Sequence, residues 1–214
     1  MSKLVAPLGL AFFFSLLTLP YLVFLHTAPL PSFHSEWLTG ITILGMSTVL
    51  LGRGSARIEI PTPALLFVAF SGALALQLSL GLILYPSQGI LAIIYLLGAA
   101  VLAISTRSLT LPYGRTAIIA LFAWAILVGG ILNSLIAILQ HWNIHSWFDN
   151  VITQQANTRA YGNLAQPNHF GNLEALAAVA LIHLAAARKI PLGLALPVGC
   201  ALALGMVLSA SRTV

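Results

Sequence analysis

Long apolar runs separated by short polar breaks cover most of the 214-residue chain. A helix needs about 20 apolar residues to cross a lipid bilayer. Seven runs approach this length, at residues 4–25, 37–52, 64–85, 89–105, 116–140, 170–187 and 190–210. The pattern predicts an all-α polytopic membrane protein with about seven transmembrane helices. Pro86, Ser87 and Gln88 are predicted to form a tight turn between the third and fourth helices.

One long interruption, residues 141–169, separates the fifth run from the sixth. In its first half, apolar residues recur at helical spacing: Ile144, Trp147, Phe148, Val151 and Ile152. This spacing predicts an amphipathic helix that lies along the membrane surface. The chain is therefore expected to have three parts: five transmembrane helices in residues 1–140, an external loop with this helix in 141–169, and two transmembrane helices in 170–214.

Composition strengthens the membrane assignment and narrows the possible partners. Hydrophobic residues make up 59% of the chain and charged residues only 6%, whereas a soluble domain carries about 25% charged residues. The formal net charge is +5, but the basic residues are scattered singly or in pairs. A lipid bilayer is therefore the expected surrounding, and no nucleic acid partner is predicted. The single cysteine, Cys200, rules out a disulfide within the chain.

The basic residues also predict an orientation. If the N-terminus is cytoplasmic, most of them fall on the cytoplasmic side: Lys3, Arg53, Arg57, Arg107, Arg115, Arg188 and Lys189. This distribution follows the positive-inside rule. Arg159 and Arg212 are the two that fall on the outer side. The loop 141–169 is then external as well.

Polar side chains crowd together in residues 159–172, at the start of the sixth apolar run. Polar groups beside hydrocarbon are costly, so such a cluster is a candidate functional site. The N-terminus of a helix presents free N–H groups and the positive pole of the helix dipole, which favour anions. The seventh helix returns to the outer face, so Arg212 is expected near Arg159. Two arginines and a helix N-terminus predict a site for pyrophosphate.

The sequence of residues 159–169, R-A-Y-G-N-L-A-Q-P-N-H, resembles the signature of the bacterial protein O-oligosaccharyltransferases, the pilin-glycosylation ligases. Ser211-Arg212-Thr213 resembles the start of the region that they share with the O-antigen ligase and polymerase superfamily. The match covers the last quarter of the chain well, and the first five spans resemble the family only in hydropathy and order. Family members are much longer, so the resemblance implies that this sequence is an N-terminal portion without independent activity.

The resemblance implies an activity and its partners. The family transfers a glycan from a polyprenyl-pyrophosphate carrier to Ser or Thr hydroxyls of exported proteins such as pilins. The reaction takes place at the periplasmic face of the bacterial inner membrane. The family is not known for a metal dependence, and no cofactor is expected. The lipid-linked glycan and an exported acceptor protein are therefore the expected partners.

Residue roles follow from the resemblance and from side-chain chemistry. Gln166 matches the family glutamine that is linked to activity, and its amide could orient the carrier phosphate or the sugar. His169 is a candidate proton shuttle, or else a capping residue. Arg159 and Arg212 would neutralise the pyrophosphate. Asn163 and Asn168 are candidate substrate contacts, or else they shape the loop and cap the helix.

Other polar residues leave alternatives open. A small transporter or channel subunit would use Glu174 and His183 along a permeation path, but it would also be expected to have polar residues along several spans. Glu174 could instead position an acceptor hydroxyl or be a structural carboxylate. His141 and His145 have a spacing that can bind zinc. No third ligand is near them in sequence, so no metal site is predicted.

Overall fold

The computed structural model describes residues 2–26, 32–51, 58–144, 147, 149–153 and 159–210. These residues form helices and connecting segments, with no β-strand among them. The chain divides into two compact units, one made of Met1–Phe13 and Gly40–Ile118, the other of Phe14–Thr39 and Ile119–Val214. Arg212 and His145, two residues of interest from the sequence, lie outside the described residues.

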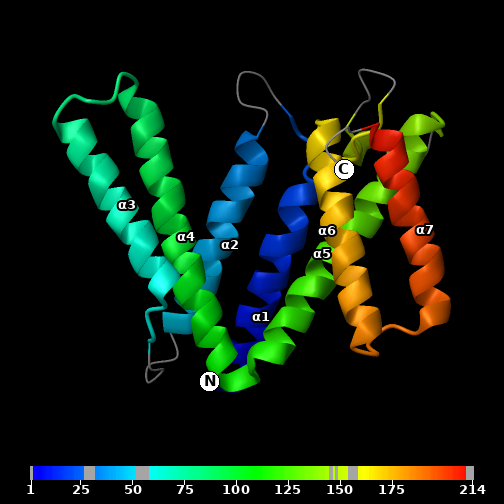
Figure 1. Cartoon of the computed structure of the whole chain (residues 1–214), viewed down its shortest axis with the longest axis horizontal. Coiled ribbons are helices and arrows are strands. Elements are labelled where there is room, and N and C mark those ends of the chain that lie inside the picture. The colour runs from blue at the N-terminus through cyan, green and yellow to red at the C-terminus, as the bar shows by residue number, and fades with distance from the viewer. Residues whose placement is uncertain are drawn as a thin grey trace. The chain divides into compact units, whose positions relative to one another are not determined.

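The helices coincide with the predicted apolar runs (Figure 1). They are α1 (Ser2–Thr18) continued by the 3-10 helix η1 (Leu19–Leu22), α2 (Phe33–Leu51), α3 (Thr62–Ser79), α4 (Pro86–Tyr113), α5 (Arg115–His141), η2 (Asp149–Val151), α6 (Pro167–Ala186) and α7 (Leu192–Ser209). The five from α3 to α7 are long and apolar enough to cross a membrane. The all-helical fold is therefore confirmed in the described residues, and five of these helices have the length and apolar composition of membrane spans. The predicted count of about seven spans is not confirmed.

In the first unit, α3 and α4 form a packed helical hairpin. The turn between them lies at residues 80–85 and contains Gly81, whose φ of 69° suits glycine. The predicted turn at Pro86-Ser87-Gln88 is wrong, because these residues form the first turn of α4. Proline is well accommodated there, since the first N–H groups of a helix have no internal partner.

Helix α4 also extends beyond the predicted end at residue 105, to Tyr113. The polar residues of its last turns do not interrupt it. Ser108 and Thr110 donate their hydroxyls to carbonyl groups of the same helix, and Arg107 forms an ion pair with Glu59 at 2.6 Å. The helix ends where Gly114 adopts a positive φ of 80°.

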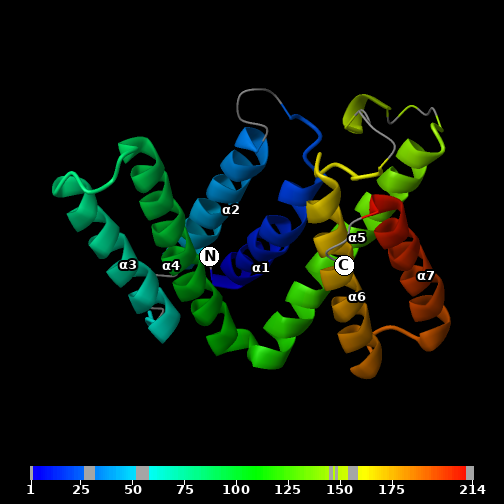
Figure 2. The ribbon, with the colours of Figure 1, turned by 45° about the horizontal axis from the view of Figure 1, so that its top comes forward.

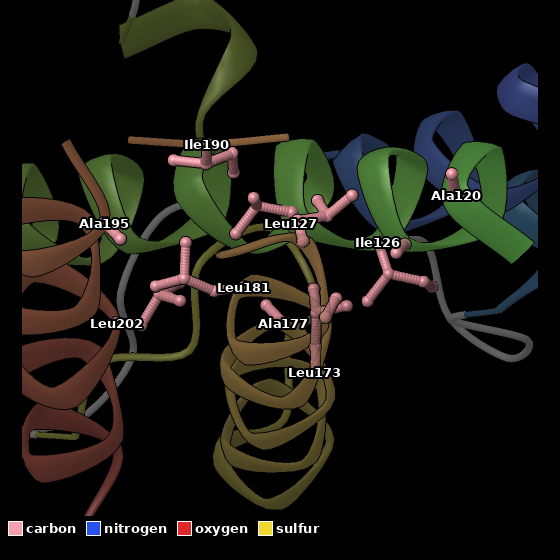
Figure 3. Close-up of a cluster of buried hydrophobic side chains, with 12 residues drawn as sticks. Ala120, Ile126, Leu127, Leu173, Ala177, Leu181, Ile190, Ala195 and Leu202 are labelled. Atoms are coloured by element: carbon pink, nitrogen blue, oxygen red, sulfur yellow. The ribbon is translucent and has the colours of Figure 1, made fainter. Parts of the chain in front are cut away.

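The core of the second unit lies among α5, α6 and α7 (Figure 3). Leu127 of α5, Leu173 of α6 and Leu202 of α7 are almost fully buried in it. Small residues bring the helices close: a side chain at Gly130 would collide with the Cβ of Ala177. Close packing of this kind through small residues is typical of membrane helices, and it holds the middle of α6 against α5.

The amphipathic helix predicted after residue 141 is wrong for the described part of that segment. Helix α5 ends at His141, and Asn143 adopts a left-handed conformation with φ 50°. The N–H groups of Asn143 and Ile144 bond to the carbonyls of Gln140 and Leu139, the pattern of a Schellman motif that ends a helix. Among the residues that the structure describes between α5 and α6, the one helix is the three-residue 3-10 helix η2. Figure 2 shows this segment above the end of α5.

Candidate functional site at the start of helix α6

The polar segment before α6 is folded around the side chain of Asn163, which is only 3% exposed. Its amide nitrogen donates to the carbonyls of Leu22 and Val151, each at 3.0 Å. Its amide oxygen accepts the backbone N–H of Thr153 at 2.9 Å. Both amide hydrogens of Asn163 are therefore used within the protein. In this structure Asn163 shapes the loop, and its contact with a substrate remains a prediction.

Two polar side chains of α5 form hydrogen bonds with the same loop. Asn133, fully buried, accepts the backbone N–H of Asn163 at 2.8 Å and donates to the carbonyls of Tyr21 and Gly129. Gln140 donates to the carbonyls of Thr153 and Gly162. Residues seven apart lie on the same face of a helix. This face of α5 therefore fixes the loop that leads into α6.

Glycine is required at position 162. Its φ is 58°, in the left-handed region. A Cβ atom there would lie 2.5 Å from the Oδ1 atom of Asn133 and 3.1 Å from its Cβ atom. The turn can therefore approach Asn133 closely enough for the hydrogen bond from Asn163 only because residue 162 has no side chain.

Arg159 lies at the C-terminal end of α7. Its Nε atom donates to the carbonyl of Ser209 at 2.9 Å, and Nη2 donates to the carbonyl of Ala210 at 3.0 Å. The backbone N–H of Ala160 bonds to the carbonyl of Leu208. A cation at this end of a helix is favoured by the helix dipole. Ser209 and Ala210 are therefore beside Arg159, whereas Arg212 lies outside the described residues.

The first turn of α6 carries the other predicted site residues. Gln166 occupies the N-cap position, and its side chain makes no capping hydrogen bond. Asn168 therefore lies inside the helix and is not the cap; its amide oxygen is 3.5 Å from Nη2 of Arg159. Gln166, Asn168 and His169 are all exposed. We call residues 159–169 the mouth segment, because it presents these side chains at the open N-terminus of α6.

Glu174 lies one turn deeper and is fully buried. Its Oε2 atom accepts the hydroxyl of Ser134 at 2.7 Å, and its Oε1 atom has no hydrogen-bond partner among the described residues. A Cβ atom at Gly205 of α7 would lie 3.3 Å from the Glu174 carboxyl carbon and 2.8 Å from the Ser134 hydroxyl oxygen. Three helices thus meet at this carboxyl group. His183, by contrast, is exposed on α6.

Sequence reasoning singled out the mouth segment but missed Asn133, Ser134 and Gln140. All three are polar residues within the predicted fifth span. Polar side chains inside a span are rare and usually face other protein groups, so their presence was the signal that could have found them. No group of three metal-ligating side chains suited to a metal ion occurs in the described ranges.

Comparison of this chain with models of known protein families, with curated proteins and with solved structures finds no match.

Proposed function

We propose that this chain is a membrane glycan transferase of the protein O-oligosaccharyltransferase type, or the donor-binding part of one. The carrier would be a polyprenyl-pyrophosphate-linked glycan, and the acceptor a Ser or Thr hydroxyl of an exported, pilin-like protein. The mouth segment would face the periplasm of a bacterial inner membrane. The resemblance of residues 159–169 to the family signature suggests this reaction.

The observation that carries the proposal is that the mouth segment combines buried residues, which fix the loop, with exposed polar residues. Asn163 and Gly162 are buried and bonded to α5, which holds the loop in one conformation. Gln166 and His169 are exposed, and their side chains form no hydrogen bond with another group in the described structure. A rigid loop that presents uncommitted polar groups at a helix N-terminus is suited to bind a phosphate-bearing ligand.

In the proposed reaction, the acceptor hydroxyl oxygen forms a bond to the anomeric carbon of the glycan. The bond from that carbon to the pyrophosphate oxygen breaks, and the pyrophosphate leaves with its polyprenyl chain. Gln166 orients the phosphate or sugar, and His169 takes the hydroxyl proton. The positive charge of Arg159 remains beside Asn168 even though its Nε and Nη2 atoms cap α7. It would stabilise the charge of the leaving pyrophosphate, with Arg212 as the second cation.

Binding of undecaprenyl pyrophosphate to the purified chain in lipid nanodiscs tests this proposal. The unaltered chain should bind, and Gln166→Ala should weaken binding about tenfold, as expected for one well-placed hydrogen bond. Asn172→Ala is the matched control, because Asn172 is an exposed amide on the same helix. Absence of binding by the unaltered chain would refute the proposal. Equal weakening by both variants would remove Gln166 from the site.

A further inference from the structure

Two adjacent residues of α5 form hydrogen bonds with the chain before and after Gln166 and His169, the proposed binding groups. Asn133 accepts the backbone N–H of Asn163, three residues before Gln166. Ser134 donates to Glu174, five residues after His169. The side chains of Asn133, Ser134 and Glu174 are all fully buried. The first turn of α6 is therefore bracketed by two hydrogen bonds from one point on α5.

The bond to Glu174 has an unusual environment. Phe170 lies one turn nearer the mouth and is fully buried, and its ring and the Glu174 carboxyl both contact the position where a side chain at Gly205 would be. Phe170 also packs with Ala137, Ala160 and Tyr161 in an apolar cluster. The side chain of Glu174 is itself fully buried. A ligand at the mouth therefore does not contact Glu174 directly.

A stabilising role alone does not account for this carboxyl group. A buried polar atom without a hydrogen-bond partner is costly, and Oε1 of Glu174 is such an atom. Apolar residues of similar volume often stabilise a protein as well as a buried polar pair or better. A directional hydrogen bond fixes the rotation and the axial position of a helix more narrowly than apolar contact does. The Ser134–Glu174 bond can therefore fix the position of α6.

We propose that Glu174, held by Ser134 and closed over by α7 at Gly205, is a positioning residue for the proposed donor site. The Ser134–Glu174 bond sets the rotation of α6 and thereby the placement of Gln166 and His169. The inference rests on the proposed function, since it names how the same site is held in its binding geometry. It assigns Glu174 no contact with the glycan or the pyrophosphate.

The test measures two quantities for each variant of the full chain in nanodiscs: the dissociation constant for undecaprenyl pyrophosphate and the melting temperature. Glu174→Met and Ser134→Ala should each weaken binding about tenfold, the effect of one lost hydrogen bond. Glu174→Met should leave the melting temperature unchanged or raised, because it removes the buried carboxyl itself. Ser134→Ala should lower the melting temperature, because both oxygens of the buried carboxyl are then without a partner. The double variant should bind no more weakly than either single variant, because both remove the same bond. Glu174→Gln, which keeps an acceptor oxygen for Ser134, should bind like the unaltered chain.

Thr18→Val is the matched control. It removes another buried interhelical hydrogen bond of the same unit, from the Thr18 hydroxyl to the carbonyl of Ala125 at 3.0 Å. Binding should be unchanged in this variant. Unaltered binding by Glu174→Met and Ser134→Ala would overturn the positioning role and leave the proposed function standing. Loss of binding in Glu174→Gln would also overturn it, since the carboxyl itself would then be needed. No binding by the unaltered chain would refute both.

Discussion

At the scale of single residues, Asn133 links more parts of the site than any side chain exposed at the mouth. Its amide joins Tyr21, Gly129 and Asn163, from three separate stretches of the chain. The polar character of residues 159–169 predicted a site there, but it could not reveal which amides face inward. The partners of Asn163 include Leu22, a residue 141 positions earlier in the sequence. Local pattern carries no information about such distant contacts.

Asn133→Leu should destabilise the chain. The substitution keeps the branched shape and the number of non-hydrogen side-chain atoms but leaves the N–H of Asn163 and the carbonyl of Tyr21 without this partner. The free energy of unfolding should fall by about 2 kcal/mol, the cost of a buried unsatisfied group. Reversible unfolding in mixed detergent micelles measures it. Asn172→Leu changes an exposed amide in the same way and should alter stability by less than about 0.5 kcal/mol. Equal stability of both variants would contradict the role of Asn133.

At the scale of elements, the apolar runs predicted the positions of the helices well, and the ends less well. Hydropathy falls at Thr106-Arg107-Ser108, yet α4 continues because hydroxyls bond to its own carbonyls and Arg107 pairs with Glu59. The predicted amphipathic helix after residue 141 is absent from the described residues, although the apolar spacing favours one. A favourable apolar spacing was overridden by the left-handed Asn143 and by the side-chain bonds that hold residues 151 and 153 to Asn163.

The C-terminal end of α7 depends on Arg159. Its guanidinium and the N–H of Ala160 together bond to the carbonyls of Leu208, Ser209 and Ala210. Arg159→Ala should destabilise this end by about 1 kcal/mol and speed amide hydrogen exchange in the last turn of α7 about fivefold. Arg159→Lys should show a smaller effect, because a single ammonium lacks the planar fork. Lys189→Ala, at the exposed turn beyond α6, is the control and should leave that exchange unchanged. Unchanged exchange in Arg159→Ala would show that α7 ends without this cap.

At the scale of the second unit, the polar mouth and the basic turn lie at opposite ends of the α6–α7 hairpin. Arg188 and Lys189 follow the last turn of α6, whereas Arg159 contacts the last residues of α7 (Figure 1). The distribution of basic residues predicted this separation, since each long apolar run reverses the chain across the bilayer. The interhelical site at Glu174 could not be predicted. It requires Ser134, Glu174 and Gly205 to meet from three helices, and a single sequence does not specify that packing.

Photocrosslinking can show directly whether the mouth segment binds a lipid pyrophosphate. A photoreactive analogue of undecaprenyl pyrophosphate is added to the chain in nanodiscs, and the mixture is irradiated. The crosslinked peptides are then identified by mass spectrometry. Crosslinks should concentrate in the peptide that contains Gln166 and His169, and excess unlabelled undecaprenyl pyrophosphate should suppress them. Crosslinks confined to the turn at Arg188 and Lys189 would show that the mouth segment is not the binding site. Crosslinks spread along α3 and α4 that the unlabelled lipid does not suppress would show the same.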